Sequence, residues 1–241
     1  STTTTTTTMT PTRTSSNSNG AAKPTPQSTP LTTTVAGAQP PHFKGAQNSP
    51  VVIEEFVDFQ CGTCAAMGPI FNDITATYGS RIKFIFRNFP LTQIHPNAYD
   101  ASVAAEAAGL QGKFWEMQNL LFQNQQRWST AAGARTLFES YADTIGLDVE
   151  KFKADLSGMT AKQRVDADMQ RGRSLNINST PTILINNRPV TPQQMNSESL
   201  KQIIDGELAK MSDGQNQTAP ASATKSPQSA AVNSSANAGN K

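Results

Sequence analysis

The sequence predicts an α/β fold in which a block of helices interrupts a small β-sheet. Two segments rich in β-branched and aromatic residues, 51–59 and 81–89, flank a helical segment, and a third follows at 181–186. Residues 95–175 carry helical spacing and no convincing strand. The only two cysteines of the chain stand where the first strand meets the first helix.

The two ends of the chain differ in composition from the part between them. Residues 1–41 are rich in Thr, Ser and Pro, and 15 threonines fall within residues 1–34. Residues 212–241 are mainly Ser, Ala, Asn and Gln. Because such stretches lack the apolar content that offsets chain entropy, both are predicted to be disordered. One domain of about 170 residues remains, which is long enough to bury a core.

Composition also argues against several functional classes. The net charge is +2 and no basic block occurs, so no nucleic-acid partner is expected. No apolar run reaches the ~18 residues of a membrane span. The two histidines, His42 and His95, are too few for a multi-histidine site, and no metal is predicted. Ser1 is not followed by a signal-peptide pattern, so any leader or anchor is expected to lie outside this chain.

The first part of the domain is predicted to be a right-handed βαβ unit. Segment 51–59 is apolar on both parities, as a central strand covered on both faces is. The helix after it is indicated by apolar residues at intervals of three and four, namely Met67, Ile70, Phe71, Ile74 and Tyr78. It ends at Gly79, and strand 81–89 is stopped by Pro90. A connection of this kind makes the two strands parallel.

The rest of the domain is predicted to be helices followed by a hairpin and a last helix. The helical segments of the block run to about residue 108 and over 113–122, 131–145, 148–156 and 160–174. The chain then returns through strand 181–186, a turn into a short partner at 187–190, and a helix over 197–211.

Two parallel strands plus an antiparallel hairpin, covered by helices, is the thioredoxin arrangement. The sequence thus predicts a thioredoxin fold with an inserted all-helical domain. Residues 42–94 and 176–211 form the thioredoxin-fold domain, and residues 95–175 form the insertion. The flanking residues 1–41 form a linker or stalk and residues 212–241 a tail.

The motif Cys61-Gly62-Thr63-Cys64 is the clearest chemical feature of the sequence. A helix N-terminus presents free N–H groups and a partial positive charge, which stabilise an anion. The Cys61 thiolate, the attacking species in disulfide exchange, is therefore favoured over a free thiol of pKa ~8.5. Cys64 lies one turn on, where it can resolve a mixed disulfide or close a 61–64 bridge.

Three less supported roles of this cysteine pair stay open. A zinc half-site needs two further ligands, and only His42 and His95 are offered, both far along the chain. A purely structural disulfide would close too short a loop to restrain the unfolded chain much. Two coincidentally buried cysteines are the third possibility. We favour a redox-active dithiol with no other cofactor.

Two further elements support the dithiol interpretation. Thr180-Pro181 opens the strand after the helical block, and we predict a cis Pro181 beside the dithiol, with Thr180 offering backbone polar groups to an extended peptide. A trans proline opening an edge strand is the alternative. Glu55 lies in the central strand, where a buried carboxylate needs a partner or a role. We predict that Glu55 relays the Cys64 proton, with Glu54 as the competing carboxylate.

Four stretches of the sequence together resemble one family. They are residues 55–64 (EFVDFQCGTC), 86–91 (FRNFPL), 104–115 with its alanines and Gly-Lys-Phe-Trp, and 179–182 (STPT). They resemble the DsbA-like thiol:disulfide oxidoreductases of the thioredoxin superfamily, in particular the bacterial BdbD-like branch. The resemblance implies that Cys61 is the nucleophile, Cys64 the resolving cysteine, Pro181 the cis-proline and Glu55 the buried acid.

One departure from that family concerns the residues between the cysteines. The best-known oxidases of the family carry Pro-His there, whereas this chain has Gly62-Thr63, neither of them charged. The Thr63 hydroxyl can offer one hydrogen bond. We therefore predict a higher Cys61 pKa and a less oxidising couple than the ~−120 mV of the strongest oxidases.

The predicted function is an extracytoplasmic protein thiol:disulfide oxidoreductase of the periplasm or cell envelope. It introduces disulfides into reduced, unfolded polypeptides, is reoxidised by a membrane quinone-linked thiol oxidase, and acts as a monomer. An N-terminal segment absent from this chain is the expected means of any membrane attachment. Two alternatives remain: a reductase or isomerase of the same fold, and a non-catalytic binding module or folding factor.

Overall fold

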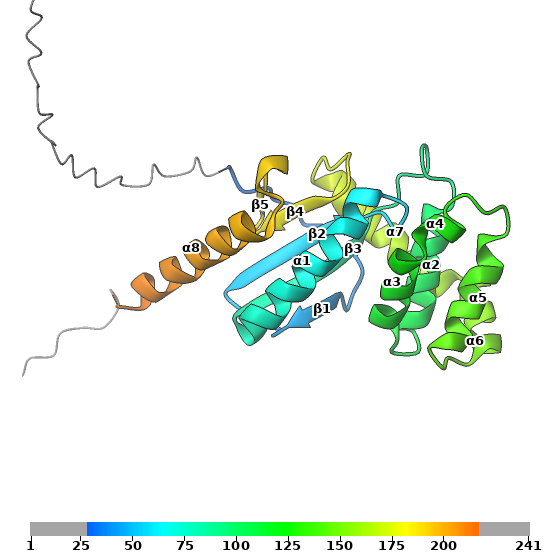
Figure 1. Ribbon diagram of the computed structural model, residues 1–241. Helices are drawn as coiled ribbons and strands as arrows, with labels where there is room; N and C mark the ends of the chain where they lie inside the picture. Colours follow the sequence, from blue (N-terminus) through cyan, green and yellow to red (C-terminus); the bar gives the residue numbers. More distant parts are fainter. Residues whose placement is uncertain (1–27, 217–241) are drawn as a thin grey trace, which may run out of the picture.

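The structure, a computed structural model, describes residues 28–216 of the 241-residue chain. A five-stranded sheet with helices on both faces lies beside a block of helices (Figure 1). This is the α/β architecture that the sequence predicts, with the helical block inserted between the βαβ unit and the hairpin. Residues 1–27 and 217–241, most of the predicted linker and tail, lie outside the described residues.

The sheet has the strand order β1-β3-β2-β4-β5. Its strands are β1 (His42–Gly45), β2 (Val51–Val57), β3 (Ile82–Asn88), β4 (Thr182–Ile185) and β5 (Arg188–Pro189). Strands β2 and β3 pair in parallel, and β4 pairs antiparallel with both β2 and β5, as the predicted βαβ unit and hairpin require. The sheet's centre is therefore β2, whose carboxyl end leads into the dithiol.

Strand β1 was not predicted from the sequence. It is four residues long and pairs antiparallel with β3, about forty residues away in the chain. Gly45 ends it at φ +91°, and a Cβ there would come within 2.0 Å of the Ile82 carbonyl oxygen. Glycine is thus required where the two strands approach each other.

Two helices cover one face of the sheet, and one helix with the N-terminal segment covers the other. Helices α1 (Gly62–Tyr78) and α8 (Ser197–Asn216) pack on the first face through a cluster that includes Ile53, Phe71 and Ile204. Helix α7 (Met159–Ser174) contacts β3 on the second. Two short 3-10 turns, Gly79–Arg81 and Pro192–Gln194, precede β3 and α8. Helix α8 continues five residues beyond its predicted end at 211.

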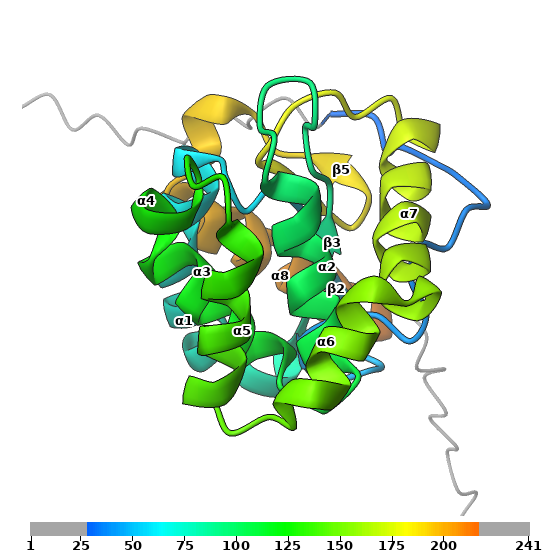
Figure 2. The same cartoon turned by 90° about the vertical axis from the view of Figure 1, so that its right-hand side faces the viewer.

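The insertion is built around α2 (Figure 2). Its helices are α2 (Ala98–Gly109), α3 (Phe114–Gln123), α4 (Gln125–Trp128), α5 (Ala134–Thr144), α6 (Val149–Ser157) and α7. Helix α2 contacts α3, α5, α6 and α7, and its alanines are all fully buried. Small side chains let four neighbours approach one helix closely, which accounts for an alanine-rich segment without a single apolar stripe.

The predicted linker is wrong for residues 28–41, which pack on the domain. Ala38 is 2% exposed, and its carbonyl oxygen accepts a hydrogen bond of 3.0 Å from Arg87. Arg87 also donates to the Ala36 carbonyl, and Arg171 donates to that of Val35. These contacts use backbone carbonyls, so a composition poor in apolar side chains does not reveal them. The folded part therefore begins before residue 42.

Two glycines offer a matched test of helix packing. In α7, a Cβ on Gly172 would lie 2.5 Å from the buried Phe89 ring, whereas a Cβ on Gly206 in α8 meets nothing within 4 Å. We expect Gly172→Ala to lower the free energy of unfolding by about 1–3 kcal/mol through overpacking. Gly206→Ala should raise it by up to about 1 kcal/mol through helix propensity. Denaturant unfolding measures both, and equal effects of the two changes would contradict the packing described.

Candidate active site

The two cysteines occupy different environments at the start of α1. Cys61 is the N-cap residue, partly exposed, and Cys64 lies in the first turn at 2% exposure. Both are free thiols in this structure. The sequence predicts this placement at the helix N-terminus, and the difference in burial assigns the accessible sulfur to Cys61.

The surroundings lower the pKa of Cys61 to about 5. The largest cause is the hydrogen bond from the Cys64 thiol, and the backbone N–H groups of Cys64 and Thr63 add to it against the cost of burial. Thr63 thus contributes through its backbone, where the sequence suggested its hydroxyl. The pKa of Cys64 is raised strongly by burial, by the same hydrogen bond and by the Glu55 charge. One sulfur is therefore held as a thiolate and the other as a thiol.

Thr180 and Pro181 lie against the Cys61 sulfur. The Thr180–Pro181 peptide bond is cis, the form expected from the sequence. The Thr180 carbonyl oxygen lies 3.5 Å from Cys61 Sγ and accepts from the thiol. The Thr180 hydroxyl is buried and has no hydrogen-bond partner within residues 28–216. When Cys61 is a thiolate this hydroxyl can donate to it, and the Thr180 side chain accordingly helps lower the Cys61 pKa.

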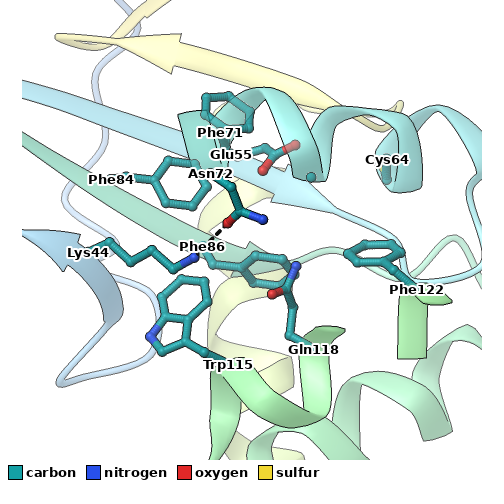
Figure 3. A pocket seen from close by; sticks show the side chains of 11 residues that line it. Lys44, Glu55, Cys64, Phe71, Asn72, Phe84, Phe86, Trp115, Gln118 and Phe122 are labelled. Carbon is teal, nitrogen blue, oxygen red and sulfur yellow. Dashed lines mark hydrogen bonds between the residues drawn. The ribbon is translucent and has the colours of Figure 1, made fainter. Parts of the chain in front are cut away.

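Glu55 is the carboxylate that faces the dithiol. It is 4% exposed, and burial, followed by the charge of Cys61, raises its pKa to about 8. It lies with Cys64 in a pocket between β2, α1 and α3, lined also by polar groups of Lys44, Asn72 and Gln118 (Figure 3). The Lys44 ammonium donates to Asn72 Oδ1 at 2.9 Å. A buried carboxyl that titrates near neutrality beside a buried thiol can exchange a proton with it.

Glu54, the competing carboxylate, faces the opposite side of the sheet. Neighbouring residues of a strand point to opposite faces. Glu54 accepts from Arg171 Nε at 2.7 Å and from Arg87 Nε at 2.6 Å. Although burial opposes it, these arginines hold the Glu54 pKa below its usual value. Glu54 is therefore a structural ion-pair partner without access to the dithiol.

The structure adds site residues that the sequence did not indicate. Lys44, Asn72 and Gln118 reach the Glu55 pocket from β1, α1 and α3, three elements far apart in the chain. No local pattern marks them. Asp58 and His95 pair with each other, since Asp58 Oδ2 lies 2.8 Å from His95 Nδ1. Within the described residues no three His, Cys, Asp or Glu side chains gather as a metal site would require.

Comparison with known proteins places the chain in a family. A family model described as thioredoxin matches residues 38–206. The chain belongs to this thioredoxin family. Its fold is also that of DsbA-type proteins. The oxidised BdbD of Bacillus subtilis is 24% identical, with a TM-score of 0.62 over 73% of this chain and 98% of that one. Wolbachia pipientis α-DsbA1 is 17% identical, with a TM-score of 0.62 over 73% and 95%.

Curated relatives at higher identity are much longer proteins. A Na⁺/H⁺ antiporter NhaA 1 of Mycolicibacterium vanbaalenii is 36% identical over 149 residues, which are 60% of this chain and 23% of the antiporter. An antiporter NhaA 3 of Salinispora tropica is 33% identical over 147 residues, or 61% and 22%. The chain thus matches less than a quarter of the length of these relatives. Among the described helices, none has both the length and the hydropathy to cross a bilayer.

The Cys61 environment predicts the pH dependence of its alkylation. In the reduced protein, the rate at which iodoacetamide alkylates Cys61 should rise with pH. The midpoint of that rise should lie near pH 5 rather than near the ordinary thiol pKa of 9.0. Cys64→Ala removes the largest stabilising hydrogen bond and should move the midpoint up by about one unit. Cys61→Ser should abolish the fast reaction. A wild-type midpoint between pH 8 and 9 would contradict the arrangement.

Glu55 predicts how stability depends on pH in the reduced protein. Its folded pKa of about 8 lies above the ordinary 4.5, so the folded state binds the proton more tightly. The resulting contribution to the free energy of unfolding is fully present below pH 4.5 and is lost as the pH rises to about 8. Glu55→Gln, which mimics the neutral acid, should be more stable than the wild type at pH 8.5 by more than about 1 kcal/mol, and nearly equal at pH 4.5. If the free energies of unfolding of the wild type and Glu55→Gln changed with pH in the same way, the prediction would be refuted.

Proposed function

We propose that this protein is a thiol:disulfide oxidoreductase that oxidises cysteine pairs in reduced, unfolded polypeptides. The observation that carries the proposal is the difference in pKa between the two thiols: the Cys61 pKa is lowered to about 5 and the Cys64 pKa is strongly raised. A good leaving sulfur at the surface and a protected thiol beneath it are what disulfide exchange requires. The fold of DsbA-type proteins agrees with this chemistry.

The proposed reaction begins from the Cys61–Cys64 disulfide. A substrate thiolate attacks Cys61 Sγ, a substrate–Cys61 disulfide forms, and the 61–64 bond breaks with Cys64 leaving as a thiolate. Glu55, protonated below about pH 8, supplies a proton to Cys64. A second substrate thiolate then attacks the substrate sulfur, and Cys61 leaves as a stabilised thiolate. The substrate loses two electrons and the enzyme dithiol gains them.

The thiolate pKa also supports the direction of the reaction. A low nucleophile pKa stabilises the reduced enzyme and makes its disulfide a stronger oxidant. A pKa of about 5 lies between the ~7 of thioredoxin and the ~3.5 of DsbA, which supports a moderately oxidising enzyme. We infer that a membrane quinone-linked thiol oxidase restores the disulfide, that no other cofactor is needed, and that the enzyme acts as a monomer.

We also propose an extracytoplasmic location, in the periplasm or cell envelope, where a dithiol oxidase has oxidisable substrates. Attachment to the membrane is supported by the matched relatives, which are named as antiporters and extend far beyond the matched segment. A reductase or isomerase of the same fold is the second candidate. A threonine before the cis-proline, as at Thr180 here, is more similar to the reductases and isomerases of the DsbA-like family than to its strongest oxidases.

Equilibration with glutathione buffers separates these functions. We expect a potential between about −230 and −150 mV, because the Cys61 pKa lies between those of thioredoxin and DsbA. A value near the ~−270 mV of thioredoxin would overturn the oxidase in favour of the reductase. Cys61→Ser should lose the ability to speed oxidative refolding of a reduced, disulfide-containing protein. If that variant kept full activity, the chain would be a non-catalytic folding factor.

A further inference from the structure

A side-chain amide of the helical insertion holds the turn that carries Cys61. Gln125, the first residue of α4, donates both of its amide hydrogens, to the Phe59 carbonyl at 2.7 Å and to the Cys61 carbonyl at 3.0 Å. These carbonyls stand on either side of Gln60. More than sixty residues separate Gln125 from this turn in the chain. One side chain thus fixes both ends of the turn from outside the thioredoxin-fold domain.

Gln60 makes the reciprocal contacts back to the insertion. Its Nε2 donates to the Ser129 carbonyl at 2.9 Å, and its Oε1 accepts from the Asn97 backbone N–H at 3.0 Å. The Asn97 side-chain amide in turn lies 3.0–3.1 Å from the carbonyls of Trp128, Ser129 and Ala131. The start of α2, helix α4 and the Cys61 turn are therefore joined by one set of amide hydrogen bonds.

The Cys61 carbonyl has a second role, since it accepts the first hydrogen bond of α1 from the Ala65 N–H at 3.2 Å. This hydrogen bond closes the first turn of α1, in which the Thr63 and Cys64 N–H groups lie. These two groups stabilise the Cys61 thiolate. The Phe59 ring already packs on Phe122 of α3, with ring centroids 5.0 Å apart, so packing of the insertion against this turn does not depend on the Gln125 amide. The Gln125 amide instead fixes the orientation of the turn that carries Cys61.

We propose that Gln125 is a positioning residue for the dithiol, through which the helical insertion sets the orientation of the Cys61 turn. The proposal builds on the proposed function, in which Cys61 is the nucleophile. It gives the insertion a part in the chemistry besides covering the sheet. Gln125 acts on the nucleophile through the Cys61 carbonyl, to which its amide donates.

The test compares Gln125→Met with Gln111→Met in the reduced protein. Gln125→Met keeps the length of the side chain and removes both donated hydrogen bonds. Gln111 is the matched control, because its amide pairs with the Asp148 backbone in both directions and joins the loop after α2 to the start of α6, away from the dithiol. The readouts are the midpoint of Cys61 alkylation with iodoacetamide against pH, and the denaturant midpoint of unfolding.

We expect Gln125→Met to raise the alkylation midpoint by about half a unit to one unit, the shift that corresponds to losing one or two hydrogen bonds at the turn. Gln111→Met should leave the midpoint unchanged. A Gln125→Met protein with a wild-type alkylation midpoint would overturn the proposal, whether or not its stability falls, since the amide would then be structural alone. Equal shifts in both variants would overturn it too.

A second variant guards against misfolding. Gln125→Asn keeps the amide but is one methylene shorter, so it cannot reach both carbonyls, and it should give a smaller shift in the same direction. If Gln125→Met does not fold, a Gln125→Asn protein whose alkylation midpoint equals that of the wild type would overturn the proposal. Because alkylation needs no turnover, these outcomes are distinct from failure of the proposed function. That failure would appear as a potential near that of thioredoxin, or as full refolding activity of Cys61→Ser.

Discussion

Strand β2 is covered on both faces, and each carboxylate on it is therefore separated from water. Glu54 and Glu55 are adjacent and both 4% exposed. As neighbours in a strand they point to opposite sides of the sheet. On one side two arginines neutralise Glu54, so the charge is kept. On the other side burial, followed by the charge of Cys61, raises the Glu55 pKa, so the carboxyl holds its proton instead. One constraint thus produces a structural ion pair and a proton donor on neighbouring residues.

The two faces then carry different parts of the molecule. The arginines that neutralise Glu54 also reach Asp168 of α7 and the carbonyls of residues 35–38, so that face unites the sheet, the insertion and the N-terminal segment. The Glu55 face leads to Cys64 and α1. Cys61 lies beyond the end of β2, next to α4, whose Gln125 donates to its carbonyl. The site is consequently assembled at the junction of the two parts of the domain.

The local sequence pattern was sufficient to predict those features whose residues are close together in the chain. The βαβ unit, the hairpin and the dithiol at a helix N-terminus follow from apolar spacing and from the residues 51–64 themselves. Strand β1, Lys44 and Gln125 could not be predicted in this way, because their partners are about thirty or more residues away. For Glu54 against Glu55 the sequence favoured Glu55 as the relay, but only the positions of Arg87 and Arg171 distinguish the two environments.

The N-terminal segment has a consequence for where the domain can be cut. Arg164 donates to the carbonyls of Gln39 and Pro40, as Arg87 and Arg171 do to those of residues 35–38. A chain trimmed at residue 42 would leave three guanidinium groups with lost acceptors, two of them beside Glu54 on the central strand. Each is a charged donor whose loss of a partner is more costly than that of a neutral one. A segment with few apolar side chains is therefore part of the folding unit, held by its peptide oxygens together with contacts such as the Ala38 N–H donated to Asp168 Oδ1.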